Sequence, residues 1–134
     1  MSNWEMIDET VNILEQKKSR YALLHCNSSY PAPHHELNLS VIPEMIKRYG
    51  CKVGYSGHEY DLEPTVIAVA LGAEIIERHV TLDHNMWGTD QKSSLEVNAM
   101  DLLRKRLSEI TIMLGKPEKI ITESEKPILN KLRG

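Results

Sequence analysis

The 134-residue sequence has little that would place it in a membrane, on a nucleic acid or outside the cell. Its longest apolar run, residues 65–73, is broken by Gly72 and has about half of the ~20 residues that a membrane span needs. Lysine and arginine are dispersed, and the formal net charge is only −3, so no basic footprint for nucleic acid or anionic lipid is present. No secretory leader pattern opens the chain. We therefore expect a cytoplasmic protein whose partners are small molecules or proteins, without nucleic acid or membrane.

Cysteine is scarce as well. Cys26 and Cys51 are the two cysteines, and their separation does not fit a metal-binding motif. Both lie in apolar runs that resemble strands, where cysteine usually acts as a small hydrophobic residue. We therefore expect no structural disulfide. The length and the 41% hydrophobic content are ordinary for one globular domain.

Helix and strand patterns alternate along the chain. Ser2 and Glu5 have the spacing of a capping box at the start of the first helix. Apolar residues at three- and four-residue steps predict helices over residues 3–17, 38–50, 64–72 and 100–114. Short apolar runs predict buried strands over residues 21–26, 51–55 and 73–80. A polar loop over 81–94 and a charged tail over 116–134, with at most one helical turn, are predicted for the remainder.

This order predicts an α/β fold with parallel strands. One helix between successive strands is the pattern of βαβ units with right-handed crossovers. Three parallel strands alone would leave two apolar edges without partners, and parallel sheets are normally covered on both faces. The sequence therefore favours a partial (β/α)8 TIM barrel over a complete domain.

Polar side chains follow each predicted strand. The carboxyl ends of parallel strands meet at one rim, where the reactive groups of such folds collect. His58 follows the second strand, His79 lies at the end of the third, and Asp90 lies on the loop beyond. Imidazole combined with oxygen ligands suits Mn²⁺, Zn²⁺ or Fe²⁺. Two histidines are too few for a complete site, so the remaining ligands would be water, substrate or a carboxylate from elsewhere.

Spacing alone leaves structural alternatives open. His58 and His79 can equally be ordinary histidines of a loop and a strand end. Glu77, on the same face as His79, can be a structural acid hydrogen-bonded to a neighbouring strand. Arg78 faces the opposite way and is expected to be structural. Ser56 and the glycine after it can simply form a turn.

The other four histidines are expected to be structural or exposed. A histidine at a strand end, as His25 is, usually has its hydrogen bonds satisfied within the core. His34, His35 and His84 lie in polar loops and are expected in solvent.

Four ordered motifs resemble the sialic acid synthase family. They are HCNSSYP at 25–31, GYSGHE at 54–59, ALGA with ERHVTLD between 70 and 83, and WGTD with SSLE between 87 and 96. Their order and spacing agree with the family over about residues 2–115. The resemblance implies a (β/α)8 barrel that condenses phosphoenolpyruvate with N-acetylmannosamine, or with a related amino sugar or its 6-phosphate, to a nine-carbon keto acid.

The resemblance also implies roles for individual residues. His58 and His79 match the family's metal ligands, with Mn²⁺ as the expected ion and Mg²⁺, Co²⁺ or Zn²⁺ as alternatives. Glu77 matches an active-site acid. Tyr30 and Asp90 match residues that hold the amino sugar, while Ser28 and Ser56 match the phosphoenolpyruvate site. The family has Asn in some members at the position of Ser28, and Ser-Asp-His in some members where this chain has Ser56, Gly57 and His58.

By the same resemblance, residues 1–115 correspond to about the last three βα units of the barrel, and residues 116–134 lead toward an antifreeze-like domain. The family's lysines for phosphoenolpyruvate lie on earlier strands, so the isolated chain is expected to be inactive. A homodimer is expected for the full-length form. Two alternatives are a non-catalytic assembly module and a complete metal-dependent hydrolase. The hydrolase would need a third protein ligand, for which only Glu77, Glu59 or Asp90 is available.

Overall fold

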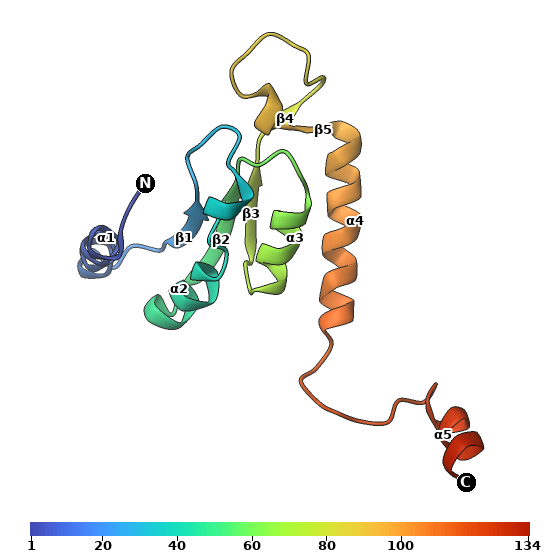
Figure 1. The fold of residues 1–134 in the computed structure, drawn as a ribbon. Coiled ribbons are helices and arrows are strands. Elements are labelled where there is room, and N and C mark those ends of the chain that lie inside the picture. The colour runs from blue at the N-terminus through green and yellow to red at the C-terminus, as the bar shows by residue number, and fades with distance from the viewer.

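A computed structural model describes residues 1–134, and its centre is a parallel sheet (Figure 1). The sheet contains β1 (Ala22–Cys26), β2 (Lys52–Gly57) and β3 (Ile75–Arg78) in the order β1-β2-β3. Both pairings are parallel, as predicted. The helices are α1 (Trp4–Gln16), α2 (Val41–Tyr49), α3 (Glu63–Ala70), α4 (Val97–Leu114) and α5 (Lys126–Arg133).

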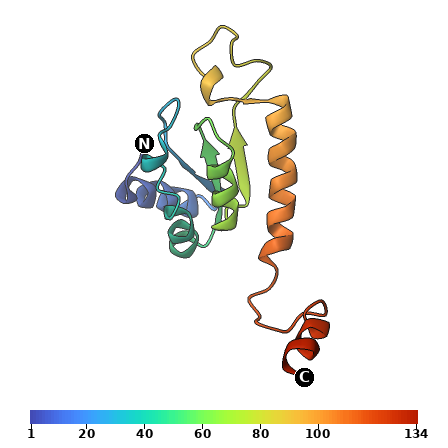
Figure 2. The same cartoon turned by 45° about the vertical axis from the view of Figure 1, so that its right-hand side comes forward.

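The connecting helices cover one face of the sheet. Ile42 and Met45 of α2 and Ala68 of α3 pack on Val53 and Tyr55 of β2 to form the buried core. Since alternate strand residues point to opposite faces, Leu24, Gly54 and Ile75, which are aligned across the strands, belong to the other face. No helix of this chain covers that face, as the turned view shows (Figure 2).

The helix ends follow the sequence, with one correction. Asn3, not Ser2, caps α1, because its side-chain oxygen accepts the Met6 N–H at 3.0 Å. The predicted capping box is therefore wrong. Gly50 ends α2 with φ +59°, a left-handed conformation that favours glycine.

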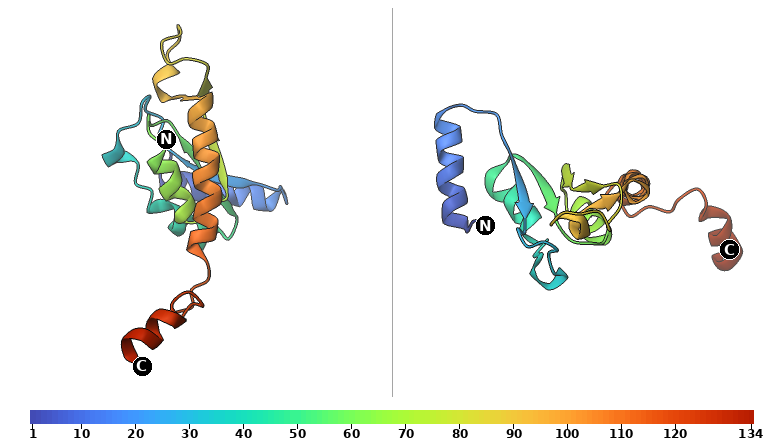
Figure 3. Two further views of the ribbon diagram at one scale, coloured as in Figure 1. Left: turned by 90° about the vertical axis from the view of Figure 1, so that its right-hand side faces the viewer. Right: turned by 90° about the horizontal axis from the view of Figure 1, so that it is seen from above.

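Helix α1 lies beside β1, at the opposite end of the molecule from α4 (Figures 1 and 3). Asp8 of α1 is hydrogen-bonded by the Tyr49 hydroxyl at 2.8 Å and forms an ion pair with Arg48. These bonds lower the pKa of Asp8 from its usual value, the Tyr49 hydroxyl having the largest effect. The guanidinium of Arg48 also lies 4.9 Å from the centre of the Trp4 ring. Polar and cation–π contacts therefore join α1 to α2.

The chain differs from the prediction after β3. Instead of one strand over 73–80, β3 ends at Arg78 and a short strand β4 (Val80–Thr81) pairs in parallel with β5 (Leu95–Glu96). The predicted loop over residues 81–94 is therefore flanked by two short strands that pair with one another. Runs of two residues are too short to give a periodic signal.

The tail also differs. Residues 126–133 form the two-turn helix α5, where a loop with at most one turn was predicted. It lies away from the sheet in every view (Figures 1 and 3). The division at residue 115 stays a prediction. None of the helices has the length and apolar character that crossing a membrane requires.

We expect the isolated chain to self-associate, because β1 and β3 each have an unpaired edge and one sheet face lacks helices. Light scattering coupled to size exclusion should give a mass above the 15.3 kDa of one chain. Leu24→Lys should reduce association by charging the uncovered face. Ile121→Lys, at an exposed apolar position outside the sheet, is the matched control. A sharp monomer peak for the unaltered chain would contradict this expectation.

Candidate metal centre

Three aromatic side chains from different segments meet at the carboxyl ends of the strands. The His58 and His79 rings lie 5.1 Å apart, centre to centre, at 72°. Tyr30 stacks on His58 at 4.2 Å and meets His79 edge-on at 5.6 Å. His58 is buried, His79 is half-buried, and Tyr30 is exposed. The structure therefore brings together the two histidines and the tyrosine that the sequence singled out separately.

His58 is held in one orientation by the loop that follows β1. Its Nδ1 lies 2.7 Å from the carbonyl oxygen of Asn27, which can only accept, so Nδ1 carries the proton and Nε2 keeps its lone pair. The Ala32 N–H donates to the His58 carbonyl at 3.1 Å. The Asn27 side chain in turn binds the carbonyl of Glu36 and the N–H of Ser29. His58 thus presents Nε2 as a potential metal-binding atom.

Tyr30 contacts that same atom. Its hydroxyl lies 3.1 Å from Nε2 of His58 and donates to it. The His79 side chain makes only ring contacts, so its nitrogens are not engaged within the chain. Ligating histidines characteristically donate their other N–H to a carbonyl or carboxylate, as His58 does. The donor chemistry of the pair therefore fits a divalent ion of the Mn²⁺ or Zn²⁺ type.

The pair does not extend to a third protein ligand. No group of three or more His, Cys, Asp or Glu side chains in the chain is arranged to hold a metal ion. Glu59, one of the candidates for a third ligand, is engaged elsewhere, in a buried ion pair.

Glu77 and Ser56 form a second contact near the pair. Cys26, Ser56 and Glu77 are aligned across the three strands. The Ser56 hydroxyl donates to Oε1 of Glu77 at 2.7 Å. Glu77 thus contacts a neighbouring strand, which is one of the alternatives left open by its spacing, and it is exposed in this chain. The Cys26 thiol lies 3.8 Å from Nδ1 of His58, a proximity that no sequence pattern predicted.

On the helix-covered face, Arg78 forms a buried ion pair with Glu59. Nη1 of Arg78 lies 2.9 Å from Oε1 of Glu59, and the two side chains are 1% and 0% exposed. The same guanidinium donates to the Thr65 hydroxyl, to the Asp61 carbonyl and to the Glu59 carbonyl. The Tyr55 hydroxyl donates to the second oxygen of Glu59 at 2.8 Å. The expectation that Arg78 is structural and faces away from His79 agrees with these contacts.

Burial and the charge of Glu59 act in the same direction on the pKa of Tyr55 and in opposite directions on the pKa of Arg78. Burial raises the pKa of Tyr55, and the negative charge of Glu59 raises it further. Burial lowers the pKa of Arg78, whereas the Glu59 carboxylate opposes that shift. Arg78 keeps its charge because a guanidinium does not lose its proton in proteins.

Gly57 lies close to this network. A Cβ at residue 57 would lie 2.8 Å from both carboxylate oxygens of Glu59 and 2.9 Å from the Tyr55 ring. Glycine between Ser56 and His58 therefore leaves room for the Glu59 carboxylate. An aspartate here would add both a clash and a like charge.

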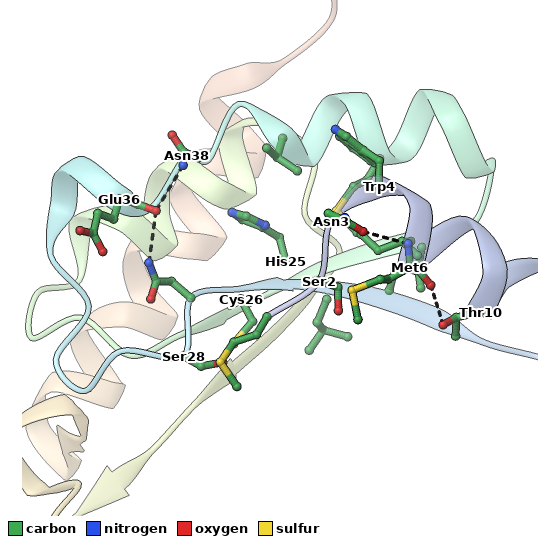
Figure 4. A pocket seen from close by; sticks show the side chains of 17 residues that line it. Ser2, Asn3, Trp4, Met6, Thr10, His25, Cys26, Ser28, Glu36 and Asn38 are labelled. Atoms are coloured by element: carbon green, nitrogen blue, oxygen red, sulfur yellow. Dashed lines mark hydrogen bonds between the residues drawn. The ribbon is translucent and has the colours of Figure 1, made fainter.

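Ser28 and Asp90 lie at the margin of the cluster. Ser28 is exposed, and its hydroxyl is 4.0 Å from the Cys26 sulfur. It borders a cavity of about 620 Å³ between the start of α1 and β1, which Figure 4 shows with Asn3 and Met6 on the α1 side. That cavity does not include the histidine pair. Asp90 makes no hydrogen bond to the cluster and binds the Thr89 hydroxyl instead.

Asp90 and Glu77 nevertheless act on Tyr30 through charge. Desolvation raises the pKa of Tyr30, and negative charges at Cys26, Asp90 and Glu77 raise it further. The tyrosine is therefore neutral at physiological pH and can donate a hydrogen bond.

The remaining histidines mostly match their predictions. Nε2 of His25 lies 2.7 Å from the Leu37 carbonyl, so His25 has a hydrogen bond as expected. His34 and His35 are 60% and 80% exposed. The prediction for His84 was wrong, because its side chain is 25% exposed and bonds the Ser94 carbonyl at 2.7 Å. The residues just before β5, which pairs with β4, lie against the His84 side chain. Cys26 and Cys51 are free thiols, as expected.

Parallel βα units with polar groups gathered at the strand ends are the arrangement of a partial TIM barrel. Comparison with known proteins gives the family: the chain belongs to the NeuB family, whose profile matches residues 1–119.

Two of the relatives are named as synthases of acidic sugars. The chain is 38% identical over 136 residues to the N,N'-diacetyllegionaminic acid synthase of Campylobacter jejuni, covering 99% of this chain and 41% of that protein. It is 34% identical over 133 residues to the N-acetylneuraminate-9-phosphate synthase of Homo sapiens, covering 98% and 37%. The chain thus spans about two fifths of the relatives it matches.

A solved structure confirms the partial barrel. The crystal structure of N-acetylneuraminic acid (sialic acid) synthetase from Leptospira borgpetersenii, in complex with citrate, matches with a TM-score of 0.87 and 36% identity. The match covers 99% of this chain and 48% of that one. The predicted fold class and the resemblance to sialic acid synthases are both confirmed.

We predict that Asp90→Asn and Glu77→Gln each lower the pKa of Tyr30, because each removes a negative charge that disfavours the phenolate. Tyrosinate absorbance against pH measures this, with Tyr30→Phe subtracted to isolate the residue. Asp101→Asn, on the exposed side of α4, is the control and should leave the pKa unchanged. Identical titrations in all variants would contradict the proximity of the three side chains.

Proposed function

We propose that this chain supplies the metal-binding part of an enzyme that condenses phosphoenolpyruvate with an N-acetylated amino sugar, or its 6-phosphate, to a nine-carbon keto acid. The observation that carries the proposal is the contact of His58 and His79 at the strand ends, with the His58 tautomer fixed by Asn27. Membership of the NeuB family, with relatives that make legionaminic and neuraminic acids, supports the reaction class.

His58 and His79 would hold the divalent ion, with Mn²⁺ first among the candidates. When bound, the ion would polarise the aldehyde of the open-chain sugar and offset the negative charge that develops on its oxygen. His58 can ligate only through Nε2, since Asn27 fixes Nδ1. The Tyr30 hydroxyl occupies that lone pair here, so metal binding requires it to turn away.

Tyr30 and Asp90 would bind the amino sugar. Tyr30 is stacked against His58 at the solvent side of the pair, and its neutral hydroxyl can donate to a sugar oxygen. Asp90 is a carboxylate on the loop above and can accept hydrogen bonds from sugar hydroxyls. Tyr30 contacts both histidines, and the charge of Asp90 raises the pKa of Tyr30, which supports a shared role in holding the sugar.

Ser28 and Ser56 would bind phosphoenolpyruvate, and Glu77 would act on the water that reaches its C2 atom. The Ser56 hydroxyl bonds Glu77, so phosphoenolpyruvate and the acid compete for one donor. Ionised Glu77 can orient water or accept its proton. Two serines offer no positive charge for an anionic substrate, so the lysines for it must come from other barrel strands.

An assembly of this chain with the rest of a barrel would complete the site. We place the protein in the cytoplasm, and the full-length form in a homodimer, on the resemblance to the family. A non-catalytic assembly module is the second candidate, and the unpaired edges of β1 and β3 favour it.

Metal binding tests the proposal most simply. Mn²⁺ or Zn²⁺ titrated calorimetrically into residues 1–134 should bind one ion per chain, and His58→Ala or His79→Ala should weaken binding at least about tenfold because each removes a ligand. His35→Ala, at an exposed loop position, is the matched control. Equal affinity in all three variants would exclude the histidine pair as the metal site.

The chain alone should not catalyse the condensation. Purified residues 1–134 with Mn²⁺, phosphoenolpyruvate and N-acetylmannosamine should release no phosphate and form no keto acid, because the expected lysines lie outside this chain. Detection of sialic acid that disappears in Glu77→Gln would show that these residues suffice, and would contradict the expectation.

A further inference from the structure

Each proposed metal ligand has a residue of the buried ion pair as its sequence neighbour. Glu59 follows His58, and Arg78 precedes His79. Histidines and ion pair lie on opposite sides of the sheet, since Glu59 and Arg78 are covered by α3 while Tyr30 contacts the two histidines at the rim. The ion pair therefore joins the two backbone positions from which the histidines project.

Arg78 binds the backbone on the far side as well as the carboxylate. Its Nη2 donates to the Glu59 carbonyl at 2.5 Å and its Nη1 to the Asp61 carbonyl at 3.1 Å. Residues 58–62 follow β2 without belonging to a helix or strand, so no ladder of backbone hydrogen bonds holds them. Side-chain bonds from Arg78 hold this segment from the α3 side, and the loop after β1 holds His58 from the other side.

Arg78 contacts its partners through two of its nitrogens, Nη1 and Nη2. One planar guanidinium reaches the Glu59 carboxylate, two carbonyls and the Thr65 hydroxyl at once. Nη1 faces three of these acceptors and Nη2 donates to the Glu59 carbonyl, whereas lysine, with one nitrogen on a flexible stem, lacks this second donor.

We infer that Glu59 and Arg78 are positioning residues for the metal centre: their buried ion pair sets the distance between His58 and His79. This inference rests on the proposed function for its consequence, metal affinity, but not for its geometry. Neither residue touches the ion or the substrates. The pair acts through the two peptide segments that carry the imidazoles.

The test separates positioning from stability. Arg78→Met keeps most of the side-chain length and removes the guanidinium, and it should weaken Mn²⁺ or Zn²⁺ binding by about tenfold, toward the lower end of what the loss of an outer-shell partner costs, because Arg78 acts on the histidines through the backbone. Ile42→Ala is the matched control, because Ile42 is fully buried in the core against α2 and β2. It should lower the unfolding temperature without changing metal affinity.

Two milder variants cover the case in which Arg78→Met does not fold. Thr65→Val removes one acceptor of Arg78 at nearly constant volume and should weaken metal binding by about two- to tenfold, the effect of one hydrogen bond. Arg78→Lys keeps the charge and should restore only part of the affinity. Unchanged metal affinity in Thr65→Val, or in any folded Arg78 variant, would overturn the inference.

Nuclear Overhauser effects among the rings of Tyr30, His58 and His79, recorded without metal, provide an independent readout. They should persist in Ile42→Ala and weaken in Arg78→Met and Thr65→Val. If His58→Ala and His79→Ala bind metal normally while the ring contacts still depend on Arg78, the proposed metal function fails and the positioning role stands. Ring contacts that are the same in all variants would remove the positioning role.

Discussion

The buried ion pair between Glu59 and Arg78 constrains the part of the chain where chemistry is expected. It joins the end of β2 to the end of β3 across the start of α3. Removing one partner of such a pair typically costs about 3–5 kcal/mol, because the other charge is left buried without compensation. Gly57 reflects the same constraint, since any side chain there would meet the Glu59 carboxylate. The Glu59 carboxylate therefore accounts for the glycine between Ser56 and His58.

Because side chains alternate along the strands, the residues of the buried ion pair and the candidate site residues lie on opposite faces of the sheet. Tyr55 and Arg78 face the helices and satisfy Glu59 there. Ser56 and Glu77, one residue away in each strand, bond to one another on the opposite side. Because the side-chain period is two, a shift of one residue would exchange these sets and bury the reactive groups. Parallel pairing of β2 with β3 therefore fixes which residues are available to substrates.

Much of this arrangement follows from sequence patterns. The order of helices and parallel strands was predicted because the apolar residues of each element repeat over enough positions to show a helical or strand pattern. The position of Arg78 on the opposite face from His79 followed from strand alternation alone. The short pairing of β4 with β5 and the burial of His84 were not predicted, since two-residue strands leave no periodic trace. The orientation of His58 was also beyond the sequence, because it depends on the carbonyl of Asn27, a group that every residue carries.

Only some of the site residues predicted from the sequence lie in contact with one another in the structure. Tyr30, His58 and His79 form one cluster, whereas Ser28 and Asp90 remain at its margin without hydrogen bonds to it.

The central claim is that the two histidines hold one divalent ion. Anomalous diffraction from crystals of the chain grown with Mn²⁺ tests it most directly. The account predicts a single peak within coordination distance of His58 Nε2 and of the His79 ring, and a peak at other residues only, or a bound ion that touches neither histidine, would contradict it.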